Sequence, residues 1–269
     1  MRAALPKELK DVVIDEVNAF ATGITCVDEY DRVEAARLIA RTNKLQAVDV
    51  VTANMLQALL YSLTGRWEER EAALLNARRN HANDEASMSE FNHRANFLFA
   101  QDAAKLVDHC LAHRADYPFM DVACASAAVG MFRKVRDYVA ASRARNEVLQ
   151  VTRDLDLIRA AADVLDAAGI GDEDVLRTID LAGEVARSHR VIWQGNMPDL
   201  RVLTPEQGGP LVALAYRYAV RPEVASEMSW SLAELMTDHG LDASVFQVWF
   251  VGTDLSAPQA RQVQELQPA

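Results

Sequence analysis

The sequence predicts a mainly α-helical protein, in which stacked antiparallel helical hairpins form an α-solenoid and a small α+β domain follows. Three observations lead to this prediction. Apolar residues recur at helical spacing over most of the chain, turn residues interrupt them at intervals of 28 to 39 residues, and short β-prone runs begin only near Ser188. We therefore divide the 269 residues into a helical repeat domain at 1–188, an α+β domain at 189–254 and a polar tail at 255–269.

The first two predicted hairpins cover the N-terminal 82 residues. A helix spans about 5–20, and Asp28 is a suitable N-cap for the next helix, since its carboxylate can accept hydrogen bonds from backbone N–H groups. Residues 53–82 form the clearest hairpin, with two helices joined by a turn at Gly65 and Trp67 opening the second. The first of these helices is apolar on more than one face, so other elements must cover it on two sides.

The hairpin pattern then repeats toward the C-terminus. After Gly65, breaks in the apolar periodicity fall at Asp102, Gly130 and Gly169, which gives intervals of 37, 28 and 39 residues. These intervals lie in the range of helical-hairpin solenoids. Asp172 is expected to cap the last helix of the array. Because each hairpin leaves an apolar face bare, the stability of such an array comes from stacking one hairpin on the next.

The stretch 53–82 resembles a tetratricopeptide repeat (TPR). The residues that carry the resemblance are Ala58, Tyr61, Gly65, Trp67, Leu74 and Ala77. A less complete copy contains Ala123, Gly130, Phe132, Val135 and Val139, and a third copy between these two contains Phe91, Ala95 and Leu98. In that middle copy Asp102 stands in place of the turn glycine, and in the first copy Arg70 replaces an expected alanine. The chain is TPR-like over roughly residues 20 to 190.

The resemblance implies a concave groove lined by the first helix of each hairpin, where ligands of the family usually lie. The matching positions are Thr52, Met55, Leu59 and Ser62 in the first copy, Asn92, His93 and Asn96 in the middle copy, and Tyr117, Met120, Cys124 and Ala127 in the last. Such a groove, apolar with a polar middle, suits an amphipathic helix or a mixed peptide. Alternatively, neighbouring helices or the C-terminal domain close over the same side chains.

The C-terminal α+β domain is predicted from the order of its β-prone runs. In chain order the predicted elements are strands at Arg190–Trp193, Leu200–Leu203 and Leu211–Val220, a helix from Pro222 to His239, and a strand at Val245–Val251. This β-β-β-α-β order favours an antiparallel meander with the helix on one face. The last run, VFQVWFV, is apolar on both faces, as a central strand would be.

Charge and composition argue against several classes of protein. A net charge of −11 is unfavourable for binding nucleic acid or an anionic membrane. The arginines between residues 133 and 145 are a local exception, which we interpret as a solvated helix face because Asp137 and Glu147 interrupt them. Three cysteines without CxxC spacing fit a reducing compartment, and no apolar run reaches the length of a membrane span. A cytoplasmic location is expected.

No motif for catalysis or for a cofactor is recognised. His109 and His113 lie four residues apart beside Cys110, but no third metal ligand is indicated. The loop Gln207–Pro210 lacks the Lys and the Ser or Thr of a phosphate cradle, and it leads into a predicted strand. We therefore expect no metal and no cofactor.

The sequence favours a non-catalytic protein–protein interaction module, an adaptor or regulator that binds a helix or peptide in the concave groove. The alternative is an enzyme or small-ligand binder whose site lies between the helical domain and the α+β domain. The aromatic residues expected at that junction are Trp193, Tyr216, Tyr218 and Trp249. A third hypothesis is a homodimer formed by strand Val245–Val251, if that strand lies at a sheet edge.

Overall fold

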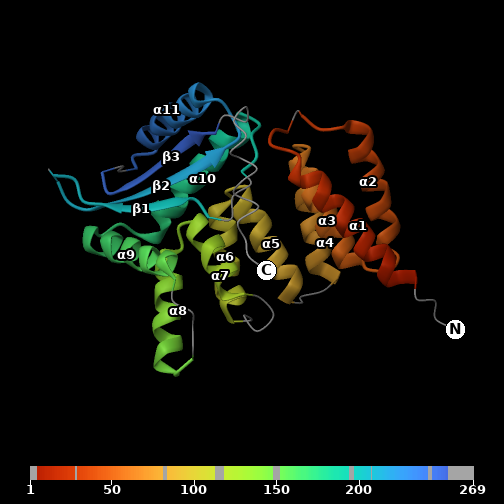
Figure 1. The fold of residues 1–269 in the computed structure, drawn as a ribbon, viewed down its shortest axis with the longest axis horizontal. Coiled ribbons are helices and arrows are strands. Elements are labelled where there is room, and N and C mark those ends of the chain that lie inside the picture. The colour runs from red at the N-terminus through yellow and green to blue at the C-terminus, as the bar shows by residue number, and fades with distance from the viewer. Residues whose placement is uncertain are drawn as a thin grey trace.

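The computed structural model describes residues 5–27, 29–80, 84–112, 118–147, 152–193, 197–206, 208–241 and 244–253. Within them the protein is mainly helical, with a three-stranded sheet near the C-terminal end (Figure 1). The helices are α1 (Leu5–Thr22), α2 (Arg32–Leu45), α3 (Val50–Leu63), α4 (Trp67–Asn80), α5 (Asp84–Asn96), α6 (Ala100–Ala112), α7 (Phe119–Ala128), α8 (Phe132–Ala144), α9 (Arg153–Ala168), α10 (Asp172–Ser188) and α11 (Pro222–Asp238). The strands are β1 (Asp199–Leu203), β2 (Leu211–Tyr218) and β3 (Phe246–Gly252).

Two of the predicted helix caps are replaced by other groups. The carboxylate that caps α2 belongs to Asp31, whose Oδ1 accepts from Val33 N at 2.8 Å and from Glu34 N at 3.1 Å. Asp28, the predicted cap, lies outside the described residues. The N-cap of α10 is Gly171, so Asp172 belongs to the first helical turn. Its negative charge there still interacts favourably with the positive end of the helix dipole.

The helices α3, α5, α7 and α9, among others, end with the same backbone geometry. The left-handed residues at these ends are Gly65, Leu98, Gly130 and Gly169, with φ between 53° and 79°. At each end the following N–H bonds back to the carbonyl five residues earlier, as Phe99 N does to Arg94 O at 2.9 Å. The predicted break at Asp102 is wrong: the turn of the third hairpin is at Leu98, and Asp102 lies in the first turn of α6.

Helix α10 packs against the turns of two hairpins. A Cβ built on Gly130 would meet Val175 and Ile179 of α10, and one built on Gly183 would meet Leu98. At a rise of 1.5 Å per residue, the contacts at 175–179 and at 183 are roughly 6–12 Å apart along the axis of α10. Neighbouring packed helices are about 8–10 Å apart, so α10 can contact two hairpin turns that lie side by side. The turn at Gly65 instead lies against Val27, and only the side chain of Arg190, beyond the end of α10, comes near it. Helix α10 therefore connects the third and fourth hairpins.

The segment after α10 joins the N-terminal hairpin instead of the sheet. Cys26 and Val191 form an isolated antiparallel bridge, supported by hydrogen bonds from Val27 N to Arg190 O at 2.8 Å and from Ile192 N to Thr25 O at 3.0 Å. The predicted first strand, Arg190–Trp193, is therefore not a strand of the sheet. Its β-prone residues are used in this bridge, which we call the 25–192 clasp.

The sheet differs from the predicted meander. Strand β1 is antiparallel to β2, with Leu200 opposite Leu214, but β3 is parallel to β2, with Val248 opposite Leu214. The sheet order is β1-β2-β3, so the central strand is β2, and β3 is at an edge. Helix α11 is the crossover connection that a parallel pair requires. As the dimer hypothesis requires, β3 is an edge strand, although its Phe250 N–H already donates to Ser229 Oγ of α11 at 3.0 Å.

One hydrophobic core joins the sheet to helices α5–α11. It runs from Met88 to Phe250 and includes residues on both sides of the predicted boundary at residue 188. The buried Tyr216 hydroxyl donates to Ala128 O at 2.6 Å, which fixes the sheet to the end of α7. In Figure 1 helices α1–α4 lie on one side of the molecule and the sheet with α9 and α11 on the other, with α5–α7 between them. A regular TPR superhelix stays a prediction.

None of the described helices is both long enough and apolar enough to cross a membrane.

Candidate functional sites

The groove positions of the first TPR-like copy are largely packed between helices. Met55 is buried against Leu74 and its neighbours in α4. Ser62 is fully buried, and its hydroxyl donates to Ala58 O at 2.8 Å. Thr52 and Leu59 are half-buried, and the Thr52 hydroxyl donates to a carboxylate oxygen of Asp49. Little of this helix face is open to a partner.

The other groove positions have mixed surroundings. Asn92, His93, Met120 and Cys124 are half-buried, Asn96 is exposed, and Ala127 is buried. Tyr117 lies outside the described residues. Burial, together with the charges of Asp154 and Asp121, raises the pKa of the Cys124 thiol to about 11. Desolvation of the His93 imidazole beside Arg70 and Arg94 lowers its pKa to about 3, so this side chain is neutral.

Three of the four aromatic residues predicted at the domain junction, Trp193, Tyr216 and Tyr218, pack into the core. Trp193 meets Tyr216 edge-on with ring centroids 5.3 Å apart, and Tyr218 meets Phe250 at 5.6 Å. Trp249 is half-buried. A pocket of about 150 Å³ does lie between α10 and the C-terminal elements, and its lining residues are Ile170, Asp174, Thr178, Gly240, Leu241 and Phe246. Asp174 is the one acidic or basic side chain in this lining.

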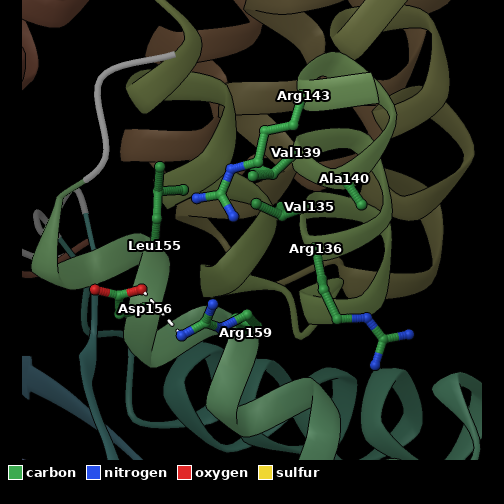
Figure 2. A pocket seen from close by; sticks show the side chains of 8 residues that line it. All are labelled: Val135, Arg136, Val139, Ala140, Arg143, Leu155, Asp156 and Arg159. Carbon is green, nitrogen blue, oxygen red and sulfur yellow. Dashed lines mark ion pairs between the residues drawn. The ribbon is translucent and has the colours of Figure 1, made fainter. Parts of the chain in front are cut away.

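A second pocket, the α8–α9 pocket, has apolar walls and a basic rim (Figure 2). It measures about 80 Å³ and is lined by Val135, Arg136, Val139, Ala140, Arg143, Leu155, Asp156 and Arg159. Figure 2 shows the guanidinium groups of Arg143 and Arg159 on two sides of the space beside Leu155, whereas that of Arg136 points away from it. The pocket therefore combines an apolar floor with two cationic groups at its mouth.

The arginines of α8 differ in how they are paired. Arg133 bonds to Asp166 and Asp172 at 2.5 Å each, and Arg136 bonds to Asp166 at 2.5 Å. Arg143, by contrast, makes no ion pair with any described residue. Arg159 of α9 has only a 3.3 Å contact with Asp156, and both side chains are more than half exposed. The two guanidiniums beside the pocket are thus the ones that remain available.

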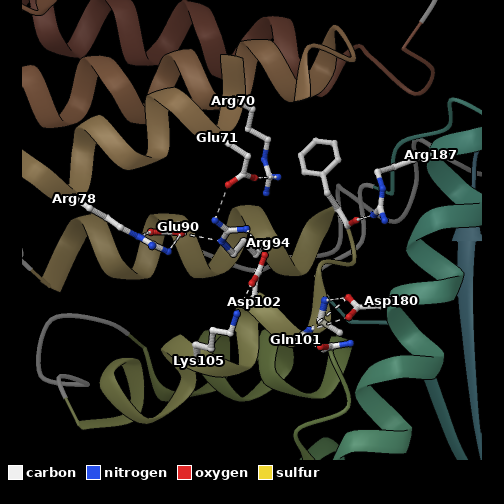
Figure 3. A network of polar contacts seen from close by, with 12 residues as sticks. Arg70, Glu71, Arg78, Glu90, Arg94, Gln101, Asp102, Lys105, Asp180 and Arg187 are labelled. Atoms are coloured by element: carbon white, nitrogen blue, oxygen red, sulfur yellow. Dashed lines mark hydrogen bonds and ion pairs between the residues drawn. The ribbon is translucent and has the colours of Figure 1, made fainter. Parts of the chain in front are cut away.

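A network of charged side chains connects α4, α5 and α6 (Figure 3). At its centre the buried Arg94 donates to Glu90 at 2.8 Å, to Asp102 at 2.9 Å and to Glu71 at 3.0 Å. Burial acts to lower the pKa of Arg94, but the hydrogen bond to Glu90 and the charges of all three carboxylates raise it above the usual value. Arg78 also holds Glu90, from the exposed side. This network fixes the third hairpin against the second.

A third pocket, the α6–α10 pocket, opens beside this network. It measures about 390 Å³ and is lined by Phe99, Gln101, Asp102, Lys105, Arg177, Asp180, Leu181, Glu184 and Arg187. Asp180 of α10 caps α6, since its Oδ1 accepts from Ala100 N at 2.5 Å, and burial raises the pKa of its carboxyl. Burial also lowers the pKa of Arg187. This pocket is large enough for a small organic ligand.

Comparison of the chain with protein-family models, with curated proteins and with solved structures finds no match. The chemistry of the pockets is therefore the basis for assigning a function.

The described residues contain no group of three or more His, Cys, Asp or Glu side chains placed to hold a metal ion. His113 and Gln207, which belong to two motifs weighed in the sequence, lie outside those residues.

Sequence reasoning missed the residues that line the α8–α9 and α6–α10 pockets. The arginine excess on α8 was visible, but the position of Arg159 opposite Arg143 depends on how α9 packs against α8. Phe99 and Arg187 are far apart in the chain, and a Phe–Arg pair has no local sequence signal. The one available signal was Arg70, which stands where the family has an alanine.

Proposed function

We propose that the protein is a non-catalytic interaction module that binds an acidic segment of a partner protein at the α8–α9 pocket. One apolar side chain of the partner enters the pocket, and flanking carboxylates pair with Arg143 and Arg159. The observation that carries the proposal is the pair of available guanidiniums beside an apolar cavity.

The size of the pocket favours an anchoring side chain over a free ligand. Sites for drug-sized molecules measure about 300–1,000 Å³, whereas this pocket measures about 80 Å³. Its walls at Val135, Val139 and Leu155 can desolvate one Leu or Ile side chain. Burying such a side chain contributes about 1.5–3 kcal/mol. This free energy alone supports only weak binding, so the contacts of the peptide with the arginines at the rim must add to it.

The basic rim favours an acidic partner despite the negative charge of the whole chain. An Arg guanidinium binds a carboxylate through two parallel hydrogen bonds, so two arginines define both the charge and the orientation of a ligand. The exposed contact of Arg159 with Asp156 contributes at most about 1 kcal/mol, so a partner carboxylate can replace it. Arg143 has no such competitor among the described residues.

The test uses a fluorescein-labelled peptide with one leucine between pairs of glutamates. We expect saturable binding by fluorescence anisotropy that weakens several-fold from 50 to 300 mM salt, because the charges at the rim are screened. Arg143→Glu should weaken binding at least about tenfold, equivalent to 1.4 kcal/mol. Ala140→Glu, on the exposed side of the pocket, should have a similar effect without disturbing the core.

The matched control is Arg145→Glu at the C-cap of the same helix. Arg145 is exposed and pairs with Glu147 at 2.8 Å, but it does not line the pocket. If this substitution weakens binding as much as Arg143→Glu, the peptide recognises the general charge of α8 and the proposed site is wrong. Replacing the central leucine of the peptide by serine should also reduce affinity, because the anchor is lost.

A further inference from the structure

Arg70 is the least satisfied charged group among the described residues. Its side chain is fully buried in α4, yet only Nη1 has a partner, Glu71 Oε1 at 2.6 Å. The Nε and Nη2 donors are buried with no hydrogen-bond partner in the described part of the chain. Buried charges in proteins are normally paired on every side, because an uncompensated one costs several kcal/mol. Burial accordingly lowers the pKa of Arg70 to about 10.

The two unpaired donors have a geometry that suits one kind of ligand. Nε and Nη2 lie on the same edge of the planar guanidinium, and their N–H bonds are parallel. This edge binds a carboxylate or a phosphate through two oxygen atoms at once. Glu71 occupies only the Nη1 side. Arg70 is thus a buried oxyanion clamp without a described partner.

Phe99 links this clamp to the α6–α10 pocket. The Arg70 Cζ lies 4.2 Å from the centroid of the Phe99 ring, and the Arg187 Cζ lies 4.1 Å from the same centroid. Both Phe99 and Arg187 line the pocket. Phe99 is half-buried, whereas Arg70 lies behind it and is not among the residues that line the pocket. A ligand in the pocket therefore reaches Arg70 only if the Phe99 ring turns aside, and binding includes that movement.

The charged side chains of the pocket differ in how many hydrogen-bond and ion-pair partners they already have. The carboxylate of Asp102 pairs with Arg94 and Lys105, and that of Asp180 accepts from two backbone N–H groups of α6. Arg187, in contrast, donates from Nη1 to the Phe97 carbonyl at 2.7 Å and forms no ion pair with a described residue. Arg187 therefore keeps donors available for a ligand, whereas Lys105 is already paired with Asp102.

We infer that the α6–α10 pocket binds a small oxyanion, a carboxylate or a phosphate group, held by Arg187 and by the Nε–Nη2 edge of Arg70. This site is separate from the α8–α9 pocket and does not depend on the peptide-binding proposal. The ligand stabilises the fold, because it gives partners to the two buried donors of Arg70 that Glu71 leaves unpaired.

The experiment measures thermal unfolding of the full chain after dialysis into HEPES and sodium chloride. Inorganic phosphate or acetate is then added at constant ionic strength. At ten times its dissociation constant, a ligand stabilises by RT ln 11, about 1.4 kcal/mol, which corresponds to a rise of about 3–6 °C for a protein of this size. A response to phosphate alone assigns a phosphate group, and a response to acetate alone assigns a carboxylate.

Two variants locate the response. Arg70→Met and Arg187→Met should abolish it, whereas Arg201→Met, at an exposed arginine paired with Asp199, should keep it. Arg70→Met removes a buried guanidinium that has only one ion-pair partner and two unsatisfied donors, so the variant should fold with an unchanged or higher melting temperature in buffer alone. Arg143→Glu should also keep the response, which separates this site from the α8–α9 pocket. No response to either anion, or a response that survives in both Met variants, would overturn the inference.

Discussion

Gly183 in the middle of α10 lies against the backbone carbonyl and the Cβ of Leu98, the residue that ends α5 in a left-handed conformation. Leu98 is a β-carbon-bearing residue in a region that glycine usually occupies, and Gly183 is a glycine in a helix interior, where alanine would be more stable. The contact between the two residues explains both the left-handed leucine and the glycine inside the helix. The close approach of α10 requires a residue without a side chain at 183, and that contact holds the turn at Leu98 in place.

Gly183→Ala should destabilise the protein, in contrast to the usual gain of about 1 kcal/mol for this change in a helix. The new methyl group would collide with the Leu98 backbone, which cannot move aside as a flexible side chain could. We expect a loss of about 1–3 kcal/mol in the free energy of unfolding, measured in urea. Gly209→Ala is the matched control, because its Cβ would enter open space, and its effect should stay within about 0.5 kcal/mol. An equal effect of both substitutions would contradict the role of the contact.

Glu90→Gln should be strongly destabilising. The carboxylate of Glu90 is buried and holds both Arg94 and Arg78, so neutralising it leaves the buried Arg94 short of a counter-charge. We expect a loss of about 3 kcal/mol in the free energy of unfolding. Asp199→Asn removes a carboxylate that holds two arginines on the exposed side of the sheet, and it should cost less than about 1 kcal/mol. Urea titration of both variants measures the two losses, and equal losses would contradict the prediction.

The stability of the protein should fall on mild acidification because of His93. The pKa of this imidazole is about 3 in the folded protein and about 6.5 when unfolded, so the unfolded chain binds more protons below pH 6.5. The contribution of His93 is fully present above pH 6.5 and is lost by about 1.4 kcal/mol per pH unit as the pH falls toward 3. Between pH 7.5 and pH 5.0 this amounts to about 2 kcal/mol.

His93→Gln tests this prediction, since an amide keeps hydrogen-bonding capacity but does not titrate. The free energy of unfolding of the variant, measured in urea at pH 7.5 and 5.0, should change less with pH than that of the wild type. The difference between the two changes isolates His93 from the carboxylates that both proteins share. Equal changes in the two proteins would show that the imidazole is accessible to protons in the folded state.

Cys124 should be unreactive toward alkylation. With a pKa of about 11, roughly one thiol in a thousand is ionised at pH 8, compared with about a quarter in a free cysteine of pKa 8.5. Because the thiolate is the nucleophile, modification by iodoacetamide should be slower by about 100-fold or more than that of glutathione. Mass spectrometry of tryptic peptides gives the rate at this residue. Addition of urea should restore the rate, and rapid reaction without urea would show that the thiol is not buried.

The helical part of the fold could be predicted because its signals are local. Gly65, Gly130 and Gly169 end their helices as expected, since a left-handed residue after a helix is commonly glycine. The turn at Leu98 could not be found this way, because the residue that permits its conformation, Gly183, is distant in the sequence. Apolar spacing also identified the three strands of the sheet, but it wrongly added a strand at Arg190–Trp193. It could not tell whether β3 pairs in parallel, since the direction of pairing depends on where α11 crosses the sheet.

The candidate sites were less predictable than the fold. The resemblance to a TPR directed attention to Met55 and Ser62, which the structure places between helices. Resemblance identifies a helix face, but neighbouring elements decide whether that face is open. Arg143 was visible only as part of a basic run. Its value as a ligand-binding group depends on the carboxylates of α9 and α10, which pair with Arg133 and Arg136 and leave Arg143 available.

The 25–192 clasp sets a limit on the order of folding. It joins the loop after α1 to the segment after α10, so it can form only when the chain between them has been made and packed. At about 5–20 residues per second, ribosomal synthesis of that chain takes roughly 10–30 s. During this time the apolar surface of Ile24 and Val27, which Ile192 later covers, stays uncovered by it. The nascent N-terminal hairpins are therefore a candidate substrate for chaperones that bind near the ribosomal exit.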